Sequence, residues 1–165
     1  MTSRRDVLLS SFATLLLTGC GYRPLYSRNG DGTDVAAKLA GIDVQEQKTR
    51  AGQLVRNELL SSMSPPGESG TTRLQLKLKV RESVTRVSHL PSSPLDRKRF
   101  NLTVGYLLTD LQGKTVNQGS SQSTVAFDTV RQPVADLQAR DTAMQRAAIE
   151  VAQDIKLRLA AYLSA

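Results

Sequence analysis

Strict alternation of aliphatic and polar side chains between residues 72 and 87 constrains the fold of this chain more than any other feature. The aliphatic positions alternate with mostly cationic ones, namely Leu74, Leu76, Leu78 and Val80 with Arg73, Gln75, Lys77, Lys79 and Arg81. Because successive side chains of a strand point to opposite faces of a sheet, this segment predicts a strand with one buried and one solvated face. A second layer of structure must cover its aliphatic face.

Three further strands are predicted by alternating patterns, at residues 42–46, 99–110 and 115–127. A loop at 88–96, which contains two prolines, and a tight turn at 112–114 separate the last three strands. Strands joined by such short connections pair antiparallel. The middle of the last strand, residues 119–123, is polar, which favours an edge position or a bulge.

Two helices are predicted by apolar residues at spacings of three and four. One covers residues 50–63, with Thr49 as its N-cap, and a longer one covers residues 135–163. The predicted fold class is therefore α+β. It is a small two-layer sandwich in which two helices cover one face of a mostly antiparallel sheet of about four strands, in the order β-α-β-β-β-α.

The N-terminus has the three parts of a bacterial lipoprotein signal peptide. Arg4 and Arg5 precede an apolar segment, Val7–Leu17, that is far shorter than the roughly 20 residues of a membrane-spanning helix. Leu17-Thr18-Gly19-Cys20 then matches the lipobox, in which small residues give a peptidase access to the bond before the cysteine. We expect a signal peptide at 1–19, a lipidated tether at 20–41 and a single α/β domain at 42–165.

Cys20 is the only cysteine of the chain, so the mature domain has neither an intramolecular disulfide nor a cysteine metal cluster. We expect its thiol to carry a diacylglycerol and the new N-terminus to carry an acyl chain, with no other cofactor. Each buried methylene adds about 0.8 kcal/mol of membrane attachment. Gly21 follows, rather than the aspartate that retains lipoproteins at the inner membrane, so we expect a periplasm-facing, lipid-anchored protein of the outer membrane. Arg4 and Arg5 leave the general and twin-arginine export routes open.

The residues give little support for an enzyme. His89 is the only histidine, and the domain has no second histidine or cysteine with which it could share a metal. The sequence contains neither a Gly-x-Ser-x-Gly elbow nor a Walker loop, and carboxylates such as Asp43 and Glu46 are scattered. We therefore expect no catalytic residues and no metal site. An envelope hydrolase of unusual design is an alternative interpretation.

The net charge of +7 favours an anionic partner. Eight cations are candidates for contacts with phosphate groups of an amphipathic lipid: Arg73, Lys77, Lys79, Arg81, Arg86, Arg97, Lys98 and Arg99. The first four share one strand face, which Arg86 is expected to continue. The alternative is a solvated strand face whose charges block edge aggregation. Nucleic acid is not expected, because the leader directs export and no aromatic residues are interleaved with the cations.

The run after the lipobox, Cys20-Gly21-Tyr22-Arg23-Pro24-Leu25-Tyr26, resembles the N-terminus of the lipopolysaccharide-assembly lipoprotein family, LptE. The Ala- and Arg-rich end of the C-terminal helix, Leu157–Leu163, and the order of elements are also similar. The resemblance implies a non-enzymatic α/β sandwich that sits as a plug inside the outer-membrane barrel LptD, helps that barrel assemble and binds lipopolysaccharide. By position, the eight cations above are the candidates for that contact. The main alternative is an auxiliary lipid- or substrate-binding lipoprotein of another envelope transport system.

Overall fold

The computed structural model describes residues 35–64, 73–88, 95–130 and 132–164. Its elements follow one another as α2 (Val35–Ala40), β1 (Ile42–Val44), α3 (Arg50–Met63), β2 (Leu74–Ser88), β3 (Leu95–Asp110), β4 (Thr115–Val130) and α4 (Pro133–Ser164). The strands form one sheet in the order β1-β2-β3-β4, in which β1 is parallel to β2 and the other neighbours are antiparallel. The predicted α+β sandwich with a four-stranded, mostly antiparallel sheet is confirmed.

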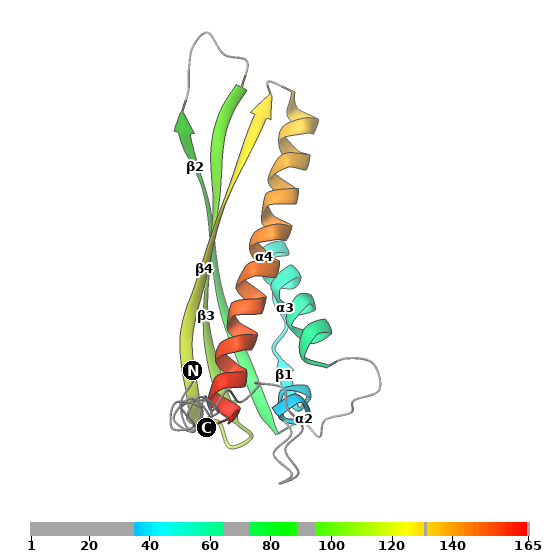
Figure 1. Ribbon diagram of the computed structural model, residues 1–165, viewed down its shortest axis with the longest axis vertical. Coiled ribbons are helices and arrows are strands. Elements are labelled where there is room, and N and C mark those ends of the chain that lie inside the picture. Colours follow the sequence, from blue (N-terminus) through cyan, green and yellow to red (C-terminus); the bar gives the residue numbers. More distant parts are fainter. Residues whose placement is uncertain (1–34, 65–72, 89–94, 131, 165) are drawn as a thin grey trace, which may run out of the picture.

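The helices lie on one face of the sheet, which we call the inner face; the opposite face is the outer face (Figure 1). α4 has 32 residues and spans about 48 Å, while the strands of 16 residues span about 53 Å. This one helix therefore runs along most of the sheet. It packs mainly against β4 and α3, and α3 lies beside β1 at one end of the sandwich.

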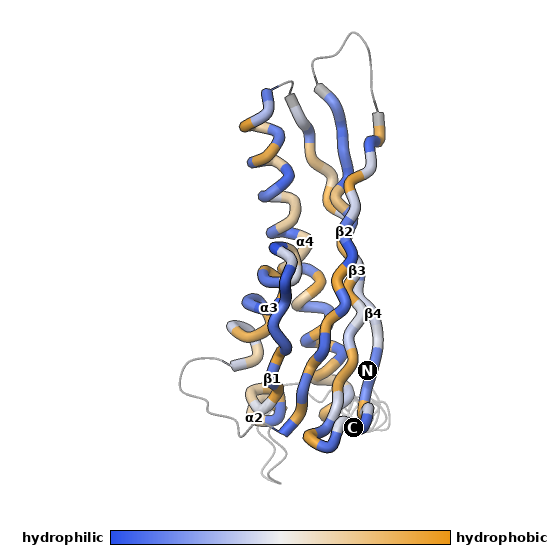
Figure 2. Tube along the Cα trace, turned by 180° about the vertical axis from the view of Figure 1, so that it is seen from behind, coloured by the Kyte–Doolittle hydropathy of each residue, from blue (hydrophilic) through white to orange (hydrophobic). Residues whose placement is uncertain are grey.

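Alternation along β2 and β3 separates the core from the solvated face. Figure 2 shows hydrophobic and hydrophilic residues following one another along these strands. The sheet contributes fully buried residues to the core, and so do the two longer helices: Leu76, Phe100, Leu102, Val104 and Leu108 pack with Val55, Leu59, Val151, Ile155 and Leu159. Burying each such side chain stabilises the fold by about 1.5–3 kcal/mol.

Polar contacts cap the two ends of α3, and one of them joins α3 to α4. The predicted N-cap of α3 is confirmed, because the amide of Gly52 donates to Thr49 Oγ1 over 3.1 Å. Lys156 Nζ donates to the carbonyl of Ser62 over 2.8 Å, which joins α4 to the end of α3. These contacts satisfy groups at the helix ends that would otherwise have no intrahelical partner.

The predicted tether at 20–41 is wrong at its C-terminal end. Residues 35–40 form helix α2, whose Val35 and Leu39 are buried in the core, and Lys38 Nζ donates to the carbonyl of Leu163 at the end of α4 over 2.9 Å. A helix of six residues is less than two turns long, so its apolar spacing gives almost no periodic signal. The described part of the folded domain begins at Val35, and Cys20, the predicted signal peptide and the rest of the predicted tether lie outside the described residues.

β3 begins at Leu95, four residues earlier than the strand predicted at 99–110. Residues 96–99 are all charged, so the apolar alternation that predicts strands is missing there. Pairing with neighbouring strands on both sides extends β3 through this charged segment, where Asp96 lies opposite Thr129 and Arg97 opposite Asp128.

Tyr106 covers a glycine on the neighbouring strand. The register places Gly119 of β4 opposite Tyr106 of β3, and the Tyr106 side chain is 7% exposed. A Cβ atom added at Gly119 would lie 2.6–2.9 Å from the ring and hydroxyl of Tyr106. At Gly105, on the outer face, the nearest atom to an added Cβ would be 4.0 Å away.

Gly119→Ala should therefore lower the free energy of unfolding by about 1–3 kcal/mol, because the enclosed Tyr106 ring must move to admit the methyl group. Gly105→Ala is the matched control, since it adds the same methyl group to the adjacent strand at an ordinary van der Waals distance of 4.0 Å from its nearest neighbours. Urea unfolding of the two variants and the unmodified chain measures the difference. Equal midpoints for the two variants would contradict this account of the Tyr106 contact.

Candidate functional site

Cationic side chains lie in line along the outer face of β2. Lys77, Lys79 and Arg81 are all exposed on this face, and the register sets Lys79 opposite Gly105 and Arg81 opposite Thr103. Alternate residues on one strand face are about 7 Å apart, so these three charges span about 14 Å. The predicted sharing of one face by these residues is confirmed.

Arg73 and Arg99 extend this line at its two ends. Arg73 directly precedes β2, and Arg99 lies on the outer face of β3 opposite Thr85; both are exposed. We refer to Arg73, Lys77, Lys79, Arg81 and Arg99 as the cationic row. Within the described residues, no carboxylate forms an ion pair with any member of the row. The row therefore presents uncompensated positive charge to an external anion.

Arg97 occupies the same face but is neutralised by Asp128 of β4. Its Nε and Nη2 atoms donate to the two carboxylate oxygens over 2.8 and 3.2 Å. The hydrogen bonds and the charge of Asp128 raise the pKa of Arg97, and the hydrogen bonds from Arg97 lower the pKa of Asp128. Arg97 is thus less available to an external phosphate than the members of the cationic row.

Arg86 and Lys98 lie opposite each other on the inner face, so the prediction that Arg86 continues the row is wrong. Arg86 is five positions after Arg81, and an odd spacing along a strand reverses the side of the sheet. Lys98 Nζ instead contacts both carboxylate oxygens of Asp136 in α4, over 3.1 and 3.2 Å. Arg86 Nε lies 3.9 Å from Asp96 Oδ2.

A second ion pair, between Glu82 of β2 and Arg140 of α4 at 3.7 Å, crosses the same end of the sandwich. Together with Lys98 and Asp136, it joins the beginning of α4 to the sheet beyond the apolar core. The inner-face cations of the predicted cluster therefore hold elements together, whereas the members of the cationic row face solvent.

A shallow hollow of about 590 Å³ adjoins the cationic row on the outer face. Lys77 and Lys79 border it on β2, Gln118 and Ser120 border it on β4, and the half-buried Leu107 contributes apolar surface. Gly105 lies between the bordering residues and has no side chain to fill the space. The hollow thus combines two ammonium groups with an apolar floor.

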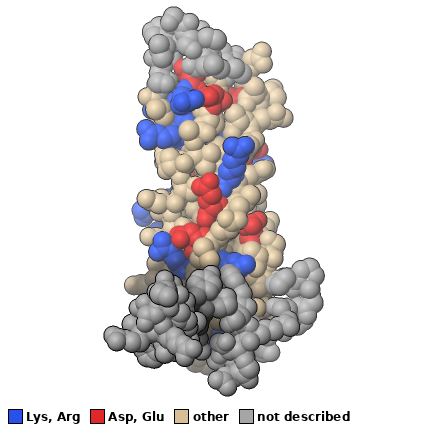
Figure 3. All heavy atoms as spheres, in the orientation of Figure 1, with Lys and Arg blue, Asp and Glu red and all other residues tan. Residues whose placement is uncertain are grey.

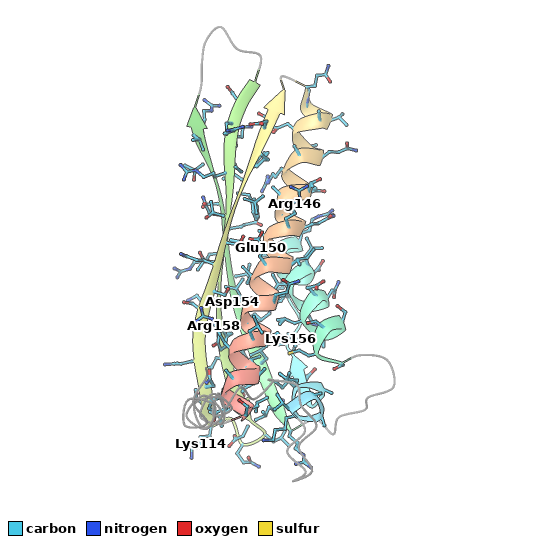
Figure 4. The ribbon with its side chains drawn as sticks, viewed as in Figure 1. Lys114, Arg146, Glu150, Asp154, Lys156 and Arg158 are labelled. Carbon is cyan, nitrogen blue, oxygen red and sulfur yellow. The ribbon has the colours of Figure 1, made fainter. Side chains whose placement is uncertain are left out.

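A polar contact between α4 and β4 has no signal in the sequence pattern. Ser121 and Ser123 lie on the inner face and are almost fully buried, and Ser123 Oγ donates to Glu150 over 2.5 Å. Glu150 and Asp154 lie on the side of α4 that faces β4 (Figure 4). The polar run at 119–123 predicted an edge strand, which is confirmed, but not this pairing, because only the three-dimensional register brings the two elements together.

The hydrogen bonds of Asp154 favour its ionised form. Partial burial opposes ionisation, but hydrogen bonds from Ser121 and Arg158, together with the charge of Arg158, outweigh it and lower the pKa of Asp154. Arg158 Nε donates to Asp154 Oδ2 over 2.9 Å.

The charges on the face seen in Figure 3 differ from those of the outer face. There, acidic and basic groups lie side by side in small groups of both signs. At the described outer-face positions of β2, β3 and β4, Asp128 is the one carboxylate, and Arg97 pairs with it.

Of the helices that the structure describes, none combines the length and apolar character that a membrane span requires.

Solved structures of bacterial lipoproteins share this fold. A Caulobacter crescentus protein, provisionally described as a lipoprotein, superposes with a TM-score of 0.68 at 27% identity, over 79% of this chain and 95% of its own. A minor lipoprotein from Acinetobacter baumannii has a TM-score of 0.50 at 13% identity, over 73% of this chain and 88% of its own. Rare lipoprotein B from Shewanella oneidensis is more distant, with a TM-score of 0.46 at 14% identity, over 73% and 92% of the two chains.

No family model and no curated protein matches the sequence. The class is instead defined by the fold, because the superpositions above place the chain among α+β sandwiches found in bacterial lipoproteins. The predicted lipobox at Leu17–Cys20 agrees with that class.

Replacing Asp154 with Asn should reduce the acid sensitivity of the fold. Because the pKa of Asp154 is lowered in the folded state, its carboxylate stabilises the protein at neutral pH, and this contribution is lost as the pH falls through the folded-state pKa. Between about pH 6 and about pH 3, the unmodified chain should lose more unfolding free energy than Asp154→Asn. Asp128 supplies a remaining acid dependence in both proteins. Identical losses in urea unfolding series would contradict the role of these hydrogen bonds.

Proposed function

We propose that this chain is an outer-membrane lipoprotein that partners a lipopolysaccharide transport barrel of the LptD type. In this role it helps the barrel assemble and assists delivery of lipopolysaccharide to the outer leaflet. The observation that carries the proposal is the cationic row, which lies without carboxylate partners among the described residues on a domain with a lipoprotein fold. The role is one of binding rather than catalysis.

Membrane attachment by Cys20 is the first part of the proposal. The basic n-region, the short apolar segment and the lipobox support cleavage before this cysteine and acylation of its thiol. Several acyl chains on one residue make release from a bilayer slow, since each methylene contributes about 0.8 kcal/mol. Gly21 supports transfer to the outer membrane, and the lipoprotein neighbours support the anchored class.

Phosphate recognition by the outer face is the second part. Lipopolysaccharide presents anionic phosphates beside acyl chains, so a complementary surface needs cations next to apolar area. Lys77 and Lys79 supply the cations, and the hollow containing Leu107 supplies the apolar area. Arg81 and Arg99 add guanidinium groups, whose planar donors match phosphate oxygens in pairs.

Insertion into a barrel is the third part. The lumen of an outer-membrane barrel is polar, and the exposed positions of β4 on the outer face are mainly polar, including Gln118, Ser120, Gln122 and Thr124. The segment after Cys20 resembles the LptE family, and this resemblance supports an LptD-type barrel as the partner.

Reversal of the two lysines that border the hollow tests the proposal. The full chain carrying Lys77→Glu and Lys79→Glu, in detergent, should bind lipopolysaccharide roughly tenfold or more weakly, because charge-assisted contacts are replaced by repulsion. Binding to the unmodified chain should fall with added salt, since both lysines are exposed.

A matched control keeps the same change in net charge. Lys48→Glu with Lys114→Glu reverses two exposed lysines that lie in a loop and in the β3–β4 turn, away from the hollow. This variant should retain affinity within about twofold, a change of roughly 0.4 kcal/mol. Equal weakening of both variants would show that net charge alone causes the loss of affinity. Unchanged affinity in Lys77→Glu/Lys79→Glu would contradict the proposed contact.

A further inference from the structure

The edge of β2 is open over most of its length. β1 pairs with β2 only from Leu74 to Leu76, and the last backbone hydrogen bond runs from the amide of Gln45 to the carbonyl of Leu76 over 3.0 Å. Beyond this point, no described residue pairs with that edge of β2, which continues to Ser88. In Figure 1 this part of β2 is the outermost strand of the upper half of the sheet.

Backbone alternation identifies the groups that face the open edge. Leu76 directs its carbonyl toward β1, and residues two apart along a strand direct their amide and carbonyl groups to the same side. The groups on the open edge are therefore those of Leu78, Val80, Glu82 and Val84. The intervening residues of β2 direct theirs toward β3.

Side chains on either side of this edge specify what could pair with it. On the outer face lie Lys77, Lys79 and Arg81, all exposed. On the inner face lie the half-buried Val80, the exposed Glu82, whose charge is paired with Arg140 of α4, and the 41% exposed Val84. An added strand would therefore need acidic side chains on its outer face and aliphatic side chains on its inner face.

β1 already follows this pattern where it pairs with β2. Asp43 is exposed on the outer side, and Ile42 and Val44 are buried on the inner side. Arg56 Nε donates to the carbonyl of Val44 over 2.9 Å, and the chain then leaves the sheet toward α3. An incoming segment of the same chemistry would continue the line of β1 along β2.

A second copy of this chain does not fit the edge. Antiparallel pairing of two β2 edges would bring Lys77, Lys79 and Arg81 of both copies onto one face, where like charges opposite each other are destabilising. Charges on an edge strand commonly block self-association in this way. The same charges favour an acidic partner.

We propose that the edge of β2 from Leu78 to Val84 binds an extended segment of another protein as an added strand, with acidic residues alternating with aliphatic ones. The strand pairing uses the backbone of β2, and the preference for acidic residues uses the outer-face cations that also form the proposed lipopolysaccharide contact. This strand-addition site does not depend on the proposed function.

Hydrogen exchange with a defined peptide tests the site. The probe is a seven-residue peptide, Val-Glu-Val-Glu-Val-Glu-Val, added to the full chain in detergent, and its control has the same composition with the valines and glutamates in separate blocks. The alternating peptide should slow exchange of the Leu78, Val80, Glu82 and Val84 amides by at least about tenfold. Amides of Lys79 and Arg81, which face β3, should not change.

Two proline variants separate strand addition from a general effect. Val80→Pro removes an amide on the open edge of β2 without removing a ladder hydrogen bond to β3, and it should weaken peptide binding about tenfold. Gln122→Pro is the matched control, because the same alternation directs its amide to the open edge of β4. Lys79→Glu should weaken binding of the alternating valine–glutamate peptide. It should strengthen binding of a third peptide in which lysine replaces each glutamate.

The proposal is overturned by any of three results: equal binding of the alternating and block peptides, equal weakening by the two proline variants, or exchange protection outside β2. Concentration-dependent protection of the same amides without peptide would assign the edge to self-association instead. If Val80→Pro fails to fold, the response of Lys79→Glu to the two peptide charges decides the question.

Discussion

The alternation of aliphatic and polar side chains between the two faces of β2 and β3 is the constraint on which the rest of the structure depends. One side of each strand supplies the aliphatic groups that the helices bury, such as Leu76 and Leu102. The other side exposes Lys77, Lys79 and Arg81 to solvent. Because both properties follow from one period of two residues, the core and the proposed lipopolysaccharide surface cannot be shifted independently: a slip of one residue would bury the cations and expose the core.

Charge has different roles at different places in this sandwich. Lys98 with Asp136, and Glu82 with Arg140, connect the beginning of α4 to the sheet where the apolar core ends. Partly exposed pairs such as these contribute on the order of 1 kcal/mol each, so this end is held less firmly than the apolar part. The cationic row instead has no carboxylate partner among the described residues, which makes it available for intermolecular contacts.

Long periodic segments of the fold were predictable, and short or register-dependent features were not. The bounds of α3 agree with the prediction at both ends, because five apolar residues and an N-cap mark it. α2 was missed, since six residues carry almost no periodicity. The predicted face of Arg86 was wrong, although its odd number of positions from Arg81 already indicates the opposite face of the strand. The contact between Ser123 and Glu150 could not be predicted, because it depends on how α4 packs against β4. For the site, the shared face of Lys77, Lys79 and Arg81 followed directly from spacing.

The central claim is that a lipid-anchored sandwich presents this cationic face inside a transport complex of the outer membrane. Isolation of the native full chain from detergent-solubilised outer membranes, followed by mass spectrometry of the isolated complex, tests it most directly. We predict a mature chain that begins at an acylated Cys20 and that co-purifies with a large outer-membrane barrel protein and lipopolysaccharide. An intact leader, a free Cys20 thiol, or an acylated chain that brings down no barrel protein would contradict the account.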